Sequence, residues 1–337
     1  MSNLTYWQRR FLRIEEERDK KEQAYIQEMN ERYNALSEKL QKEIDAWVHK
    51  YAVNDAISEA EANQLISAKE RRTWSMQLAE FKRKAVEGGY EQELNREYYL
   101  SRITRLQELE AQLAFELAEQ AHTEDMKLSA HLKDTLGETY LKHIFEITDR
   151  GSFSVTFATY SSKQLAVAIR KPWSGSDFSK RIWSNHLDYI PEKLSKTLSE
   201  AIAKGWGTDK TVSKMMEGVD KNLRNRMITL VQSESAHIAE EASQDSYRET
   251  KVDKYQWLAT LETHTCDQCA GLDMKIFEVD GQDSMHPVVD THPNCRCTTV
   301  PYIDAMPALT TRWQRDPITG KGSIQKVQSF EEWKKAV

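Results

Sequence analysis

Residues 266–297 read CDQCAGLDMKIFEVDGQDSMHPVVDTHPNCRC and contain all four cysteines of this 337-residue chain. The cysteines form two close pairs, and a histidine stands just before the second pair. The side chains concerned are Cys266, Cys269, His292, Cys295 and Cys297. Such clustering is typical of a metal-binding knuckle or of a loop closed by disulfides. The stretch therefore predicts a small unit, a knuckle over residues 264–297, that its cysteines hold together.

The choice between metal and disulfide depends on the compartment. The first residues of the chain are charged and helical in pattern, unlike a secretory signal peptide, and no apolar run approaches the roughly 18 residues that a membrane span needs. We therefore expect the protein to mature in the cytosol and to have no membrane-spanning segment. Persistent disulfides are rare there, whereas thiolates stay free to bind zinc. Reduced structural cysteines, or a disulfide formed late, stay open as the alternative.

The four cysteines are the simplest ligand set for a tetrahedral zinc ion. His292 could replace one of them, because the short spacing between Cys295 and Cys297 is tight for two ligands of one ion. His264 and His286 are weaker candidates, and we expect both to be ordinary loop histidines. The zinc is expected to be structural, because a catalytic zinc keeps one position open beside a carboxylate base, and the His-x-Glu motif of the deaminases is missing.

The N-terminal part of the chain is expected to be helical, because glycine and proline are nearly absent from it. Apolar residues between Ile26 and Tyr51 recur at steps of three and four, which is the stripe of an amphipathic helix with coiled-coil character. We expect one long helix from about Thr5 to Tyr51 and a second from Tyr99 to Leu117 that packs back against it. Residues 1–135 are thus predicted to form an extended helical arm, with an ordinary helical bundle as the alternative.

After Gly137 the long helical pattern gives way to shorter segments, which predicts a second domain over residues 136–305. Alternating residues over 153–157 indicate a short extended segment. Helical patterns then follow between proline and glycine breakers, and a strand at 255–259 leads into the cysteines. The fold class is therefore mainly α with a small α+β C-terminal domain. Residues 306–337 are predicted to be a tail with one short helix.

Several motifs follow one another in order within residues 136–305. They are Trp173-x-Gly175, Phe178-Ser179-x-Arg181-Ile182-Trp183, the glycine turn Gly205 to Gly207, Ser233-Glu234, Lys254-Tyr255-Gln256-Trp257, Cys266-x-x-Cys269, Gly271 and His292-Pro293-Asn294-Cys295-Arg296-Cys297. Together they resemble the phage head-morphogenesis, or minor head protein, family (Mu F-like). Members commonly carry an arginine and a threonine before the glutamate of the central helix. Here Gln232-Ser233-Glu234 stands in that place, so any shared polar role of that position is not carried over.

The resemblance implies a structural minor capsid protein of a tailed phage, and not an enzyme. Proteins of this kind act in capsid assembly, bind the portal protein and the major capsid or scaffolding protein, and leave the capsid with the packaged DNA. The expected location is therefore the virion, inside the capsid near the portal, with the host cytoplasm as the place of assembly. The long helical region before the matching motifs is compatible with a portal-binding or capsid-lining arm.

Two other classes of protein stay open. A DNA-binding zinc protein on the packaged genome would retain DNA with a steep salt dependence, but the net charge of −6 and the mixed charge runs favour solvated helix faces. An enzyme or toxin would need a site such as Glu234-x-x-His237, a pair that we expect on an exposed helix face. Glycine-rich nucleotide motifs are missing from the sequence, and the tail leaves no room for a toxin module.

Overall fold

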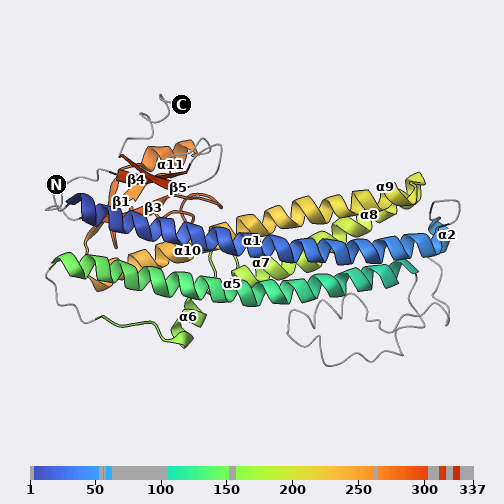
Figure 1. The fold of residues 1–337 in the computed structure, drawn as a ribbon, viewed down its shortest axis with the longest axis horizontal. Helices are drawn as coiled ribbons and strands as arrows, with labels where there is room; N and C mark the ends of the chain where they lie inside the picture. The colour runs from blue at the N-terminus through green and yellow to red at the C-terminus, as the bar shows by residue number, and fades with distance from the viewer. Residues whose placement is uncertain are drawn as a thin grey trace. The chain divides into compact units, whose positions relative to one another are not determined.

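The computed structural model is mainly helical, with a small antiparallel sheet toward the C-terminus (Figure 1). It describes residues 4–52, 56, 58–62, 105–151, 157–260, 265–302, 311–315 and 322–326. The predicted fold class is confirmed. The described helices contain no apolar run long enough to cross a membrane.

The chain divides into two compact units, each assembled from separate stretches of sequence. We call the first the sheet unit; it takes Met1–Ile26, Leu128–Gly175 and Thr229–Val337. We call the second the helical unit; it takes Gln27–Lys127 and Ser176–Ile228. The long helices α1, α5 and α10 contribute residues to both units, so neither unit is a continuous stretch of chain.

The helical unit is built on two antiparallel helices that run side by side (Figure 1). Its described elements are parts of α1 (Leu4–Tyr51), α5 (Arg105–Gly151) and α10 (Arg224–Glu249), with α2 (Glu59–Ala62), α7 (Phe178–Ser184), the π-helix η1 (Asn185–Tyr189), α8 (Ile190–Lys204), α9 (Thr208–Glu217) and the π-helix η2 (Gly218–Leu223). The apolar stripe expected on the first helix is buried, from Met29 at 0 % exposure to Trp47 at 3 %. Burial of this stripe stabilises a helix of 48 residues, since a polar helix of that length would not hold by propensity alone.

A paired carboxylate lies in the same interface between α1 and α5. Glu124 is fully buried, and Arg32 reaches it with two parallel hydrogen bonds, Nε to Oε1 at 2.7 Å and Nη2 to Oε2 at 2.9 Å. This bidentate geometry offsets the cost of burying the carboxylate and sets the register of the two helices.

The sheet unit combines helices with three antiparallel strands in the order β2-β1-β3. Besides its parts of α1, α5 and α10, it contains α6 (Ser162–Ala168), β1 (Lys254–Leu258), α11 (Asp267–Leu272), β2 (Ile276–Glu278), β3 (Thr298–Tyr302), β4 (Thr311–Arg315) and β5 (Gly322–Lys326). Tyr255 of the central strand pairs with Phe277 on one side and Pro301 on the other. Tyr255 and Tyr247 are fully buried in one apolar cluster, and Trp257 of the same strand belongs to a second cluster that contains three of the cysteines.

Several expectations differ from the structure in detail. Helix α5 continues through Gly137 to Gly151, well beyond Leu117. Leu165 of α6 lies over this glycine, where a Cβ would meet it at an ordinary 3.9 Å. The domain boundary at residue 135 stays a prediction, although α5 passes through it without a break.

In the tail, β4 and β5 pair as an antiparallel ribbon that the sequence analysis did not foresee. The expected short helix at 329–336 lies outside the described residues, and so do residues 153–156 of the expected extended segment.

Three helical histidines are held neutral: His143 of α5 and His186 of η1 are buried, and His131 of α5 is half-buried. Burial lowers the pKa of His131 to about 4, of His143 to about 3 and of His186 to about 4. At His186 the tautomer follows from the contacts. The Ile182 carbonyl can only accept, so Nδ1–H donates to it at 2.8 Å, and Nε2 accepts from the Tyr33 hydroxyl at 2.8 Å.

Acidification should therefore destabilise the protein. The folded-state pKa of each buried histidine is lowered, so the stability it contributes is present above the unfolded pKa of about 6.5 and is lost as pH falls toward the folded value. The loss at pH 5 is about 2 kcal/mol per histidine. In urea titrations, His186→Gln should lose about 2 kcal/mol less than the wild type between pH 7 and pH 5. His49→Gln, at an exposed position, is the control. Equal pH dependence in both variants would contradict the assignment.

Candidate metal centre

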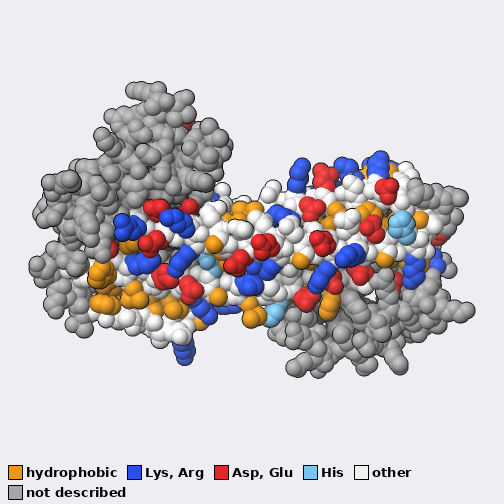
Figure 2. Space-filling view, in the orientation of Figure 1, with side chains coloured by type: hydrophobic (Ala, Val, Ile, Leu, Met, Phe, Trp, Pro, Cys, Tyr) orange, Lys and Arg blue, Asp and Glu red, His pale blue; other side chains and the backbone are white. Residues whose placement is uncertain are grey.

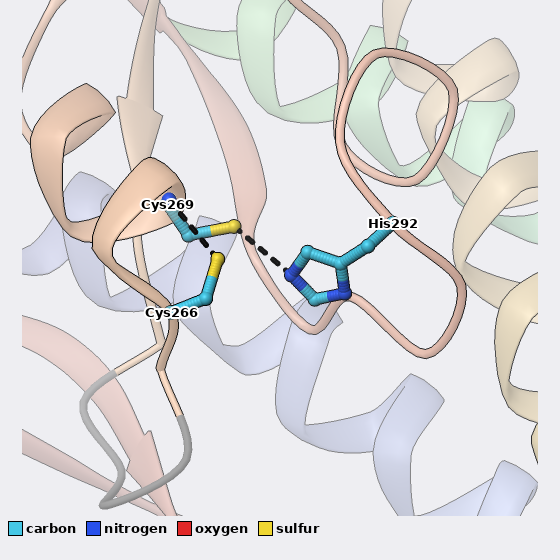
Figure 3. A group of neighbouring side chains, drawn as sticks. All are labelled: Cys266, Cys269 and His292. Atoms are coloured by element: carbon cyan, nitrogen blue, oxygen red, sulfur yellow. Dashed lines mark hydrogen bonds between the residues drawn. The ribbon is translucent and has the colours of Figure 1, made fainter.

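The structure brings all five predicted ligand residues together. They form two overlapping groups, each with its ligand atoms within 4.8 Å of one another. One group is Cys266, Cys269 and His292, drawn in Figure 3, and the other is Cys269, Cys295 and Cys297. Cys269 belongs to both groups and is 2 % exposed. The thiols from α11 and from the segment before β3 therefore meet at Cys269.

The first half of the centre depends on the start of α11. Cys266 is the N-cap, with extended backbone angles of φ −73° and ψ 160°, and its sulfur accepts the backbone N–H of Cys269 at 3.4 Å. The extended backbone of an N-cap residue places its side chain within hydrogen-bonding reach of the N–H of the third helical residue. The Cys-x-x-Cys spacing thus places both sulfurs at the same end of a short helix.

The second half depends on a tight turn. The Cys295 N–H donates to the His292 carbonyl at 3.3 Å, Pro293 follows His292, and Asn294 has a positive φ of 62°. Proline at the second position and asparagine at the third, left-handed position are the residues that a type II turn favours. The Asn294 N–H is also satisfied, because it donates to Ser233 Oγ of α10 at 2.7 Å. The sequence His-Pro-Asn-Cys therefore turns the chain so that His292 and Cys295 both reach Cys269.

Two of the distances between donor atoms suit a shared metal ion. Cys269 Sγ lies 3.7 Å from Cys295 Sγ and 3.4 Å from His292 Nε2. Zinc–sulfur bonds of about 2.3 Å and zinc–nitrogen bonds of about 2.0–2.1 Å in a tetrahedron separate two sulfurs by about 3.8 Å, and sulfur from nitrogen by about 3.5 Å. The donors are therefore spaced as the edges of such a coordination shell, and the cluster fits a soft divalent cation.

The protonation of the cluster fits the same chemistry. Nδ1 of His292 lies 2.9 Å from the Pro293 carbonyl, which can only accept, so Nδ1 carries a proton and Nε2 faces the thiols. Hydrogen bonds from Cys269 and Cys297 lower the pKa of Cys295. The contact with Cys295 raises the pKa of Cys269, and the contact with Cys269 raises that of Cys297. Thiols must lose their protons to bind a cation, so metal binding at this cluster would be coupled to proton release.

Two further histidines, His264 and His286, were weaker candidates. His264 is outside the described residues. His286 points at α10, where its Nδ1 lies 3.3 Å from Glu240 Oε1. Glu240 also accepts from Thr299 Oγ1 at 2.8 Å and from Gln244 Nε2 at 2.6 Å. Burial lowers the pKa of His286, but the adjacent Glu240 outweighs it, so the pKa is raised overall.

The expectation that Glu234 and His237 occupy an exposed helix face is wrong. Glu234 is 1 % exposed and His237 is 5 % exposed. Trp173 covers them both: its indole Nε1 donates to Glu234 Oε2 at 2.8 Å, and its ring centroid lies 4.7 Å from that of His237. Trp173 also packs against the apolar cluster that contains the cysteines. The burial could not be read from the helix itself, because the covering side chain lies 61 positions away.

A comparison with known protein families finds a match in this region of the chain. Residues 192–300 match the family model described as Phage Mu protein F like protein. The matched segment is about a third of the chain and contains all five residues of the metal centre. No match was found among curated proteins or among solved structures. The resemblance to the Mu F-like proteins is therefore confirmed for residues 192–300, which run from α8 into β3.

Removing the indole donor tests the structural role of Trp173. Trp173→Phe keeps a ring over His237 but leaves Glu234 without this hydrogen bond, and the expected loss is about 2 kcal/mol of unfolding free energy. Trp206→Phe is the matched control, because Trp206 is half-buried in the turn before α9 and its ring lies under the cations of Lys204 and Lys210, contacts that a phenylalanine ring can keep. The measurement is a urea titration of both variants, and a loss no larger than that of the control would argue against the assignment.

Proposed function

We propose that this protein is a structural minor head protein of a tailed phage that acts in head morphogenesis. The observation that carries the proposal is the Mu F-like match over residues 192–300, which coincides with the convergence of the cysteines. Glu234 and His237 were the one pair considered as a catalytic site. Their burial beneath Trp173 supports a structural role for them instead.

The proposed partners are the portal protein and the inner capsid or scaffold, with the helical region up to residue 135 as the arm that binds them. Long helices α1 and α5 support an extended binding surface. Figure 2 shows acidic and basic side chains interspersed along the visible face. Ion pairs such as Lys39 with Glu116 at 3.2 Å and Lys142 with Glu17 at 2.8 Å join α1 to α5. Mixed charge of this kind favours protein partners over a phosphate backbone.

We further propose that the metal centre binds one structural zinc ion. Zinc would supply a tetrahedral cross-link between α11 and the turn before β3. Cys269 is the shared ligand, Cys266 and His292 complete one side, and Cys295 or Cys297 completes the fourth position. Few apolar side chains of residues 279–297 are buried, among them Val279 and Val288. Hydrophobic burial therefore contributes little to holding this segment, and a metal cross-link would add the missing restraint.

The zinc content of the purified protein tests this site. We expect close to one zinc per chain by elemental analysis in the wild type and loss of zinc in Cys269→Ser, because that thiol belongs to both ligand groups. His292→Gln should weaken zinc retention, whereas His286→Gln should leave it unchanged, since His286 faces Glu240. A wild-type protein that is free of metal, with a melting temperature that a chelator does not alter, would refute the zinc site.

The assembly role is tested in phage particles. A tagged copy should copurify with the portal protein from lysates and be present in purified heads, and reversing exposed charges of α1 with Glu28→Lys and Glu38→Lys should reduce portal capture while the buried stripe stays intact. Cys269→Ser serves as a comparison, because it alters the zinc centre and leaves the helical arm in place. Absence of the protein from both particles and portal complexes would rule out the proposal.

A further inference from the structure

Arg296 connects the metal centre to helix α1. It stands between Cys295 and Cys297, and in an extended chain successive side chains point in opposite directions. The two cysteines accordingly face the sulfur cluster, while the guanidinium reaches α1, with Nη1 3.3 Å from Glu22 Oε1 and 3.9 Å from Asp19 Oδ1. The Cys-Arg-Cys pattern therefore ties one short segment to the cluster on one side and to a helix on the other.

The contact with α1 is largely shielded from water. Asp19 and Glu22 are three residues apart and share one face of the helix. The exposed side-chain fractions are 15 % for Arg296, 17 % for Asp19 and 8 % for Glu22. Removal of one partner from a buried ion pair is strongly destabilising, because the remaining charge stays desolvated. The guanidinium thus matters more here than in an exposed pair.

The position of Arg296 is set by its main chain. The Thr260 hydroxyl donates to the Arg296 carbonyl, and Asn294 on the other side of Cys295 is held by Ser233. A small cavity of about 40 Å³ lies beside the ion pair, lined among others by Arg18, Gln232 and Cys295. The ion pair therefore lies at a place where packing is incomplete, and it adds to the apolar contacts of Ile14, Tyr25 and Ile26 on the same part of α1.

We propose that Arg296 is a positioning residue that couples metal binding to the docking of the first part of α1, over residues 13–26. An ion bound through Cys295 or Cys297 restrains the backbone of Arg296, which then presents its guanidinium to Asp19 and Glu22. Loss of the ion releases this segment and weakens the contact. The proposal rests on the proposed zinc site, and by linkage the docked helix must in turn strengthen zinc binding by the same factor.

Hydrogen exchange of the full-length protein tests the coupling, with zinc as the probe and a chelator to remove it. Zinc removal from the wild type should speed amide exchange in residues 13–26 about tenfold or more, within the range of coupling factors of about 5 to 150. Zinc-loaded Arg296→Gln should show the same faster exchange while it still holds zinc. Its zinc affinity, measured by competition with a chromophoric chelator, should fall by a similar factor. Arg296→Lys should recover part of both effects.

The matched control is Arg248→Gln, which removes an exposed ion pair with Asp245 and Asp280 in the same unit. It should change neither exchange in residues 13–26 nor zinc affinity. If Arg296→Gln fails to fold, the double variant Asp19→Asn with Glu22→Gln tests the same contact from the helix side and leaves the turn before β3 intact.

The outcomes separate the two proposals. Bound zinc together with unchanged exchange of residues 13–26 on chelation would overturn the coupling and leave the zinc site standing. Faster exchange in Arg296→Gln without any change in zinc affinity would also overturn it, because the coupling must be reciprocal. If elemental analysis finds no zinc in the purified protein, both the zinc site and the coupling through Arg296 are overturned.

Discussion

The approach of thiols from two separate segments to Cys269 is the contact on which the sheet unit depends. Cys269 lies on α11, Cys295 lies 3.7 Å away just before β3, and the chain between them makes turns with few buried apolar side chains. Such a segment gains little from hydrophobic burial, so it must be held by directed interactions. Ligation of one cation would supply several at once, and the turn around Asn294 gives the backbone shape that they need.

Hydrogen bonds around Glu240 also help to hold this segment in place. Glu240 is 5 % exposed and accepts hydrogen bonds from Thr299 and Gln244, with His286 close by. It therefore ties α10 to β3 and to the loop that leads to the cysteines. A buried carboxylate is tolerated when its oxygens are satisfied, and the donors here come from three different segments. In the sheet unit, polar contacts that join distant positions in the chain thus add to its two apolar clusters.

In the helical unit, the apolar stripe along α1 is the main feature of the sequence that specifies the helix and its buried face. A 3.6-residue period was visible on the first helix, and every large residue that the stripe predicted between Met29 and Tyr51 is buried. Proline and glycine also marked the ends of α8 correctly: Pro191 lies in its first turn, and Gly205 takes the left-handed φ of 60° at its C-terminus. These signals are local, since each depends on the backbone preference of one residue or on the spacing within one helix.

The sequence alone determined the helical class, the long first helix, the strand before the cysteines and the identity of the residues that meet at the candidate metal centre. Each of these follows from periodicity or from spacing over a few residues. Only the tertiary structure decided that Trp173 buries Glu234 and His237 and that Arg296 reaches Asp19 and Glu22. In each case the deciding partner lies far away in the chain, and the burial of a polar side chain depends on that partner and not on its own neighbours in sequence.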